Sequence, residues 1–210
     1  PQDVMLHYNY GYTLLQLKRY DEAERAFVRT ESIANRLSNQ DVMLHRIRSH
    51  RAEVQHAAGR LDAAKAQFLE LLPWQQHNDP LGQVVTLQRL ARIALEQDQP
   101  EEARRLGEQA LAVAEPGRFP EGIRDSLDLL AEISMALGDP TQARDYLRQA
   151  RQIDQARMKG DSLNRLARLQ ARAEQALEPI RFNATQEASR DRLLRNAALA
   201  DEHGHQHHVD

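Results

Sequence analysis

The hexapeptide DQPEEA at residues 98–103 is a turn followed by the start of a helix, and it recurs in altered form along the chain. Related phrases occupy residues 18–23 (KRYDEA), 59–64 (GRLDAA) and 138–143 (GDPTQA). Each phrase ends on an alanine, and the four alanines are 41, 39 and 40 residues apart. Self-similarity at a nearly fixed spacing predicts an array of repeated structural units.

Two of these phrases contain a proline at the expected first turn of a helix, where the N–H that proline lacks has no partner to lose. These prolines are Pro100 and Pro140. Glu101 and Glu102 follow Pro100, and acidic side chains are favoured at the positive N-terminal end of a helix. We therefore expect helices to begin at Pro100 and at Pro140.

Each unit also carries small and apolar residues at matching positions. About twelve residues before each alanine stands a small residue that lets two helices approach closely: Gly11, Ala52, Ala91 and Ala131. Apolar side chains follow the alanines by four or seven positions, on one helical stripe, with Gly107 as an exception: Phe27, Phe68, Leu147, Ala110 and Ala150. A short helix pair cannot bury both of its faces alone, so neighbouring pairs are expected to stack.

In these features the chain resembles the tetratricopeptide-repeat (TPR) family over roughly residues 3–158. It departs from that family in its period of about forty instead of 34 residues, in the missing tryptophan of the first helix, and at Gly107, where an aromatic residue is usual. The resemblance implies an all-α fold: a right-handed superhelix of about four antiparallel helix pairs, followed by a long kinked C-terminal helix. The longer helices resemble the TPR arrays of bacterial signalling proteins.

A second duplication supports the repeat. The hexapeptide QDVMLH occupies residues 2–7 and again residues 40–45, 38 residues apart. Compared with the spacing of 41 between the first two alanines, this predicts that the first helix of the second repeat is three residues longer, almost one turn, with its buried face preserved.

After residue 159 the pattern changes. Gly160 fits a helix C-cap, and Asp161 or Ser162 fits the N-cap of a new helix with this apolar stripe: Leu163, Leu166, Leu169, Ala173, Leu177 and Ile180. Pro179 must kink or break that helix. Two interpretations remain open: a kinked helix whose first half packs on the fourth repeat, which we favour, and a degenerate fifth repeat that turns at Glu178-Pro179.

These boundaries divide the chain into three parts. Residues 1–159 are the TPR array, residues 160–202 are a capping and signalling helix, and residues 203–210 are a His-rich tail or a linker to an output domain. The tail has four histidines in six residues, a composition able to hold Zn²⁺, Ni²⁺ or Cu²⁺. Because a flexible end presents no preset geometry, we predict no metal site.

Composition and motifs exclude several functions. The formal net charge is −3, so the basic footprint of a nucleic-acid binder is missing, and no apolar run is long enough to cross a membrane. We expect a cytoplasmic protein without nucleic-acid or membrane partners. No phosphate-binding loop, metalloprotease motif or nucleophile elbow is present. We therefore predict no catalytic residue, no cofactor and no enzyme activity in this segment.

The inner faces of the first helices form an extended groove in such arrays. Counting from each small residue predicts nine ligand-binding side chains there, with Leu15, Leu95 and Met135 beside them: Tyr8, Tyr12, Ser49, Glu53, His56, Gln88, Arg92, Asp128 and Glu132. The groove begins aromatic and ends acidic. The lysines and asparagines with which TPR co-chaperones grip a C-terminal carboxylate are absent. Tyr8 and Tyr12 either grip a peptide or are buried by preceding repeats.

The resemblance implies a non-catalytic regulatory module of a bacterial signal-transduction protein. In this interpretation the sensory array binds a peptide or protein segment, or dimerises. Residues 162–202 then pass the change to an output domain, for which we favour a GGDEF-type diguanylate cyclase; histidine kinases and helix-turn-helix regulators remain open. The alternative is a stand-alone TPR scaffold for protein complex assembly. We also expect a homodimer through residues 180–202, against the alternative of a terminal helix ordered only by a downstream domain.

Overall fold

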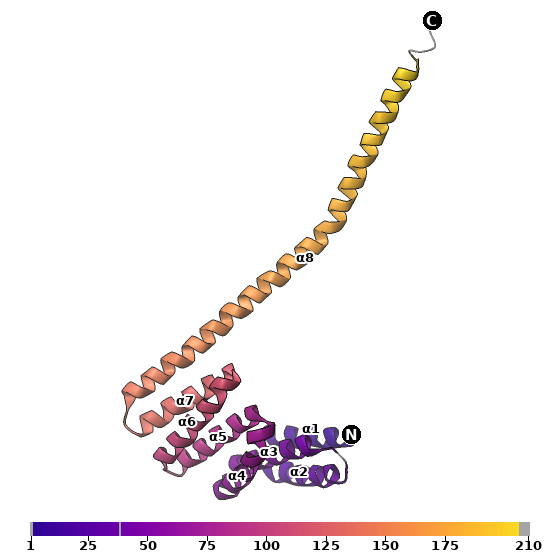
Figure 1. Ribbon diagram of the computed structural model, residues 1–210. Helices are drawn as coiled ribbons and strands as arrows, with labels where there is room; N and C mark the ends of the chain where they lie inside the picture. Colours follow the sequence, from indigo (N-terminus) through magenta and orange to yellow (C-terminus); the bar gives the residue numbers. More distant parts are fainter. Residues whose placement is uncertain (1, 38, 206–210) are drawn as a thin grey trace. The chain divides into compact units, whose positions relative to one another are not determined.

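The computed structural model describes residues 2–37 and 39–205, and in these ranges the chain forms helices and no strand (Figure 1). The all-α prediction is therefore confirmed. The helices are α1 (Gln2–Gln16), α2 (Tyr20–Ala34), α3 (Asp41–Ala57), α4 (Leu61–Asn78), α5 (Pro80–Glu96), α6 (Pro100–Gly117), α7 (Pro120–Ala136) and α8 (Pro140–His205). The chain forms two separate units, Pro1–Asp154 and Gln155–Asp210.

The first unit is a series of antiparallel helix pairs. From α1 to α7 each helix contacts the next along the chain, and two first helices also contact each other in the pairs α1 with α3 and α5 with α7. The fourth pair is α7 with the start of α8, where Ala143 and Ala150 are buried. The predicted arrangement of four helix pairs is confirmed.

The four turns inside the pairs share one backbone conformation. Each has a residue with positive φ at the same repeat position: Lys18 (58°), Gly59 (75°), Asp98 (58°) and Gly138 (77°). The amide of the following residue then donates a hydrogen bond to the carbonyl five residues back, as Gln99 does to Ala94 at 2.9 Å. This pattern closes the C-terminal end of each first helix, and two of the four repeats supply the glycine that it favours.

Prolines start four consecutive helices. The predicted starts at Pro100 and Pro140 are confirmed, and Pro80 and Pro120 begin α5 and α7 in the same way. The sequence analysis did not recognise these two, although the four prolines are spaced by twenty residues. They place the last two repeats in regular register.

The repeat alanines lie inside the array. Ala23, Ala64, Ala103 and Ala143 are all buried, and so are the small residues predicted to allow close helix approach. At Gly11, for example, an added Cβ would lie 3.0 Å from Cε1 of Phe27. Phe27 and Phe68 are fully buried, whereas Leu147 at the corresponding position is 40% exposed.

Gly107, the exception in the pattern, has a structural reason. A Cβ built there would lie 2.9 Å from Cδ2 of Leu130, a buried side chain of α7. Leu130 thus fills the space beside α6, and an aromatic residue at position 107 would collide with it. The missing aromatic residue does not disrupt the repeat.

The duplicated hexapeptides do not share an environment. Val4 is 1% exposed on α1, but its copy Val42 is 64% exposed on α3. A shift of three residues rotates the pattern by about 60° away from a whole turn, because the helix has 3.6 residues per turn. The expectation that the buried face is preserved is therefore wrong, and the helices differ in length by two residues, 15 against 17.

The predicted helix end at Gly160 is also wrong. Residues 140–205 form one helix, and Asp161 and Ser162 lie inside it instead of capping a new one. A lone glycine costs only about 1 kcal/mol in a helix, which the residues on both sides outweigh. The helix also continues through Pro179, so no fifth repeat turns there; its ribbon bends in the light-orange part without interruption (Figure 1).

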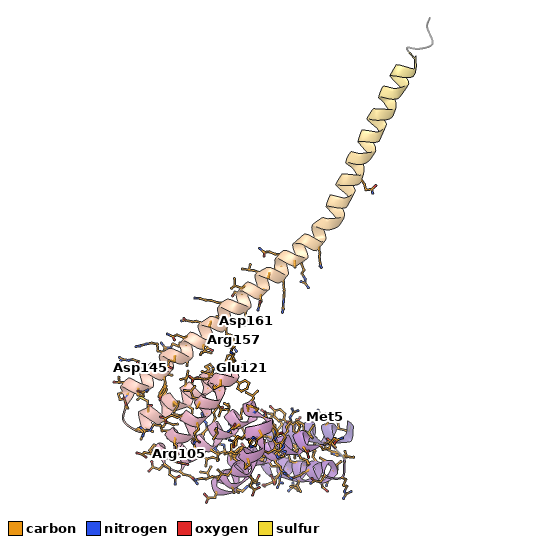
Figure 2. All side chains as sticks on the ribbon, viewed as in Figure 1. Met5, Arg105, Glu121, Asp145, Arg157 and Asp161 are labelled. Carbon is orange, nitrogen blue, oxygen red and sulfur yellow. The ribbon has the colours of Figure 1, made fainter. Side chains whose placement is uncertain are left out.

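Three leucines of the predicted stripe are exposed on α8. Leu163, Leu166 and Leu169 are 67%, 57% and 53% exposed, and Figure 2 shows the side chains in this part of α8 projecting from the helix. The packing of this half of the stripe on the fourth repeat stays a prediction. The side chains of Ala173, Leu177 and Ile180 and residues 206–210 of the His-rich tail lie outside the described part. No described helix is long and apolar enough to span a membrane.

Candidate functional site

The nine predicted ligand-binding residues lie on the four first helices, at positions that repeat along the array. Tyr8, Ser49, Gln88 and Asp128 occupy one position, and Tyr12, Glu53, Arg92 and Glu132 occupy the position one turn later. His56 lies one further turn along α3. We call the surface that these nine residues define the inner face.

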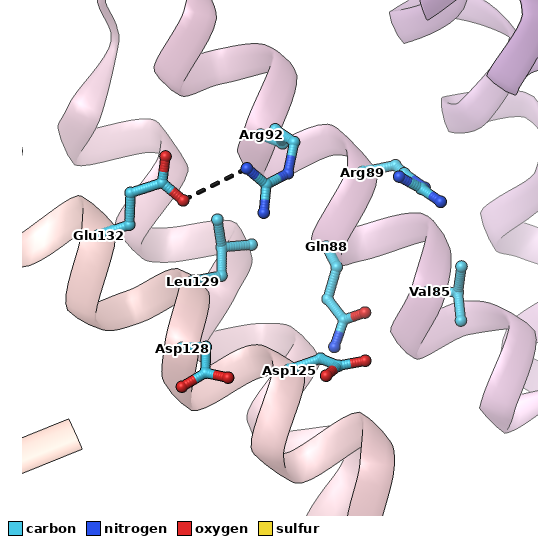
Figure 3. A pocket seen from close by; sticks show the side chains of 8 residues that line it. All are labelled: Val85, Gln88, Arg89, Arg92, Asp125, Asp128, Leu129 and Glu132. Carbon is cyan, nitrogen blue, oxygen red and sulfur yellow. Dashed lines mark hydrogen bonds and ion pairs between the residues drawn. The ribbon is translucent and has the colours of Figure 1, made fainter. Parts of the chain in front are cut away.

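One cavity of the inner face lies between α5 and α7, the first helices of the last two repeats. A cavity of about 470 Å³ separates α5 from α7 (Figure 3). Its lining consists of Val85, Gln88, Arg89, Arg92, Asp125, Asp128, Leu129 and Glu132. We call it the α5–α7 pocket. Four of the nine predicted residues line it, so sequence counting placed them on a common surface.

Gln88 holds the two walls of the pocket together. Its Nε2 donates hydrogen bonds to the carbonyl oxygen of Gly122 at 3.0 Å and to Oγ of Ser126 at 2.9 Å, both on α7. Ser126 is fully buried, so this bond is shielded from water. The Gln88 side chain therefore fixes the spacing of α5 and α7.

The arginines of the pocket are paired across helices. Arg92 lies 3.3 Å from Glu132 on α7, as the dashed line in Figure 3 marks, and Arg89 lies 3.2 Å from Glu53 on α3. The side chains of Arg92 and Glu132 are 43% and 53% exposed. Exposed ion pairs contribute little to stability, typically about 0–1 kcal/mol. Breaking the Arg92–Glu132 pair therefore costs little stability.

Asp128 differs from the other charged groups of the pocket. Within residues 2–37 and 39–205, its carboxylate forms no hydrogen bond or ion pair, whereas Asp125 pairs with Arg124. Partial burial raises the pKa of Asp128 above its ordinary value; Arg124 lowers it, and Asp125 and Asp154 raise it further. The pocket thus presents one acidic group that a cationic partner would stabilise.

The second repeat contributes two smaller cavities. Ser49 and Glu53 line one of about 360 Å³, together with Val85 from α5. Glu53 and His56 line another of about 270 Å³, together with Leu15 from α1. His56 itself is paired, with its Nε2 3.0 Å from Glu96. These three predicted residues therefore lie near the α5–α7 pocket but outside it.

The aromatic end of the inner face is a packed cluster. The ring centroid of Tyr8 lies 6.0 Å from that of Phe27 and 5.4 Å from that of His50, and the ring of Tyr12 lies 5.3 Å from His50. Burial raises the pKa of Tyr8, with a smaller opposing effect of Arg46. Tyr8 therefore packs inside the first unit, while Tyr12 remains 42% exposed.

Several site residues were not predicted. Arg89 and Leu129 each lie one position after a counted residue, and Val85 and Asp125 each lie three positions before one. Counting every fourth residue from a small residue missed them, although a full helical face spans more than one such row. In the described part of the chain, no group of three His, Asp or Glu side chains is placed to hold a metal ion.

Models of the tetratricopeptide repeat match four segments of the sequence: residues 6–34, 45–70, 84–115 and 125–157. Together they cover more than half of the 210 residues. The matches coincide with the four helix pairs of the first unit. No curated protein sequence matches the chain.

Solved structures of low sequence identity share the fold. BtubC from P. vanneervenii is similar with a TM-score of 0.65 and 17% identity over 75% of this chain. Aspartyl phosphate phosphatase F from Bacillus subtilis is similar with a TM-score of 0.70 and 16% identity over 74%. The apo form of RapI gives 0.66 and 17% over 77%. The chain spans only 65%, 41% and 59% of these three proteins.

Proposed function

We propose that this chain, which belongs to the tetratricopeptide-repeat family, is a non-catalytic module that binds a peptide or protein segment on its inner face. The observation that carries this proposal is the α5–α7 pocket: four residues counted from the sequence line one open cavity. Gln88 holds its walls at a fixed spacing, so the surface is formed before any ligand arrives.

The charges of the pocket favour a ligand with at least one basic side chain. Among residues 2–37 and 39–205 no side chain forms an ion pair or hydrogen bond with the Asp128 carboxylate, and a lysine or arginine from the ligand would lower its pKa back toward the ordinary range. Arg92 and Glu132 can exchange their mutual ion pair for contacts with the ligand backbone or side chains. Val85, which is 37% exposed, supplies apolar surface that a side chain of the ligand would cover.

In this proposal the module belongs to a bacterial signalling protein and passes ligand binding on through α8. Supporting it, α8 is one uninterrupted helix that contains both the buried Ala143 of the fourth repeat and residues 162–202. A downstream diguanylate cyclase is the output that we favour from the sequence. The stand-alone scaffold is the alternative, and translation of the next thirty codons distinguishes them: a Leu-Thr-Gly-Leu phrase supports the cyclase, a stop codon the scaffold.

Homodimerisation through residues 180–202 is part of the same proposal. It is tested by light scattering of the 210-residue chain and of a chain that ends at Glu178. A dimer that is lost on truncation supports it, and equal monomeric masses contradict it.

Ligand binding is tested with a library of random displayed peptides selected on the wild-type chain. The variant Tyr12→Ala/Arg92→Ala/Glu132→Ala should lose at least ten-fold in affinity for the selected peptides, because all three side chains lie exposed on the inner face. The control is Arg104→Ala/Glu108→Ala, which removes opposite charges from exposed positions on α6. Peptides that bind the triple variant as tightly as the wild type would place recognition elsewhere.

A further inference from the structure

One side of α1 exposes apolar residues in a row. Leu6 and Tyr10 are 69% and 55% exposed, and Thr13 is exposed as well. Spacings of four and three residues place them on one side of the helix, within about 60° of arc. We call these three residues the α1 outer face.

The repeat provides three internal copies of this face, and all three are covered. Adding the spacings between the repeat alanines gives the positions equivalent to Leu6, Tyr10 and Thr13 in the other three repeats. They are 47, 51 and 54 on α3; 86, 90 and 93 on α5; and 126, 130 and 133 on α7. Eight of these nine positions are buried: Ile47, Val54, Thr86, Leu90, Ile93, Ser126, Leu130 and Ile133. The ninth, Arg51, is bonded to Glu24 and Glu31 of α2.

In each copy the cover is the second helix of the preceding repeat. Arg51 on α3 reaches two carboxylates of α2, and Leu130 and Ile133 on α7 lie against Gly107 of α6. Helix α4 contacts α5 in the same way. Three equivalent interfaces therefore show what kind of element fits this face: an antiparallel second helix of the neighbouring repeat.

We propose that the α1 outer face is the seat of the second helix of a further repeat, which precedes α1 in the same polypeptide. A terminal repeat of a solenoid needs a polar outer face, whereas α1 exposes Leu6 and Tyr10 on this side. A second copy of the chain is the weaker occupant, because one 15-residue helix against its copy is a small contact beside the roughly 1,200 Å² of a stable interface.

The chain contains no cysteine, so the reactivity of one introduced thiol shows whether this face is exposed to solvent or covered. The test compares Tyr10→Cys in the 210-residue chain with the same substitution in the polypeptide extended by the residues that its gene encodes upstream. Leu69→Cys, at a position 48% exposed on α4, is the control in both chains. Circular dichroism checks that each variant keeps its helices.

In the 210-residue chain, Tyr10→Cys should react with a thiol reagent as fast as Leu69→Cys. In the extended polypeptide it should react at least ten-fold more slowly, while the control is unchanged. Equal rates in the two polypeptides, or a gene that encodes no helix pair upstream, would overturn the proposal. Slow labelling in the 210-residue chain that speeds up on dilution would also overturn it, because a second copy would then be the cover.

Discussion

Tyr8 and Asp128 occupy the same repeat position at opposite ends of the inner face, and the array uses them differently. Tyr8 packs against Phe27 and His50 and is partly buried. Asp128 is exposed beside an open cavity and has no partner among the described residues. At the first end, the residue at this position packs against neighbouring rings. At the last end, we propose that it is available to a ligand.

This difference teaches that repeat position alone does not assign a role. The neighbours across the helices decide it: an aromatic ring on α2 and an imidazole on α3 enclose Tyr8, whereas Arg124 and Asp125 beside Asp128 are engaged with each other. The inner face therefore divides into an aromatic end that stabilises the fold and a charged end that we propose binds the ligand.

The largest expected effect concerns the aromatic end. Replacing Phe27 with alanine should lower the free energy of unfolding by about 3–5 kcal/mol, because the ring is fully buried against Tyr8 and Gly11. Leu147→Ala is the matched control, because Leu147 occupies the same repeat position as Phe27 but is 40% exposed. This substitution should lower the free energy of unfolding by less than about 1 kcal/mol. Urea unfolding measures the free energy of unfolding of both variants. Equal decreases would contradict the proposed difference between the two ends.

The next effect tests what the two ends share. Ala64→Leu and Ala143→Leu should each destabilise by about 1–3 kcal/mol, because both alanines are buried at helix contacts without room for a larger side chain. The neighbouring Ala63 is exposed, so Ala63→Leu serves as the control. Melting temperatures that stay unchanged in both buried variants would reject the repeat register.

A direct comparison of the two ends uses the residue that the second repeat carries at this position, serine. Tyr8→Ser should lower stability by about 1–2 kcal/mol, since it removes aromatic contacts with Phe27 and His50. Asp128→Ser should not lower it, because a raised carboxyl pKa means that folding disfavours the charged form. Chemical denaturation at neutral pH checks both. A larger loss of stability for Asp128→Ser than for Tyr8→Ser would contradict this account of the two ends.

The smallest expected effect contrasts two glutamates. Burial acts to raise the pKa of Glu31, but hydrogen bonds from Arg48 and Arg51 outweigh it, and the pKa is lowered. Its stabilisation is fully present above the ordinary pKa of glutamate and is lost as pH falls through the lower folded-state value. Glu31→Gln should therefore cost about 1 kcal/mol at neutral pH and flatten the acid side of the stability profile.

Glu132→Gln at the charged end is the counterpart. Its carboxylate is more than half exposed, so the substitution should change stability by less than about 0.5 kcal/mol. Thermal melts between neutral and acid pH measure both variants. Identical pH profiles of stability for wild type and Glu31→Gln would contradict the lowered pKa of Glu31.

Local signals predicted the array well. The turn phrases, the four alanines and two of the four starting prolines sufficed for the helix pairs, because caps and small residues act within one or two turns of helix. Four residues of the α5–α7 pocket followed from the same register. The end at Gly160 failed because a glycine without a required positive φ is a weak signal against helix-forming residues on both sides.

The sequence did not reveal contacts that depend on register between helices. His50 joins the aromatic cluster from α3, and Arg89 and Asp125 enter the pocket from positions beside the counted rows. Whether Tyr8 is packed or free depends on Phe27 and His50, 19 and 42 positions away along the chain. Single-helix periodicity contains no information about such partners.

The most direct test of the central claim is the affinity of a selected peptide for Asp128→Asn, measured by fluorescence anisotropy beside the wild type and the control Glu108→Gln on α6. Asparagine keeps the size of the side chain and removes the charge that we propose a basic ligand contacts. The account predicts at least ten-fold weaker binding to Asp128→Asn, an unchanged value for the control, and a smaller dependence on salt. Equal affinities for wild type and Asp128→Asn would contradict it.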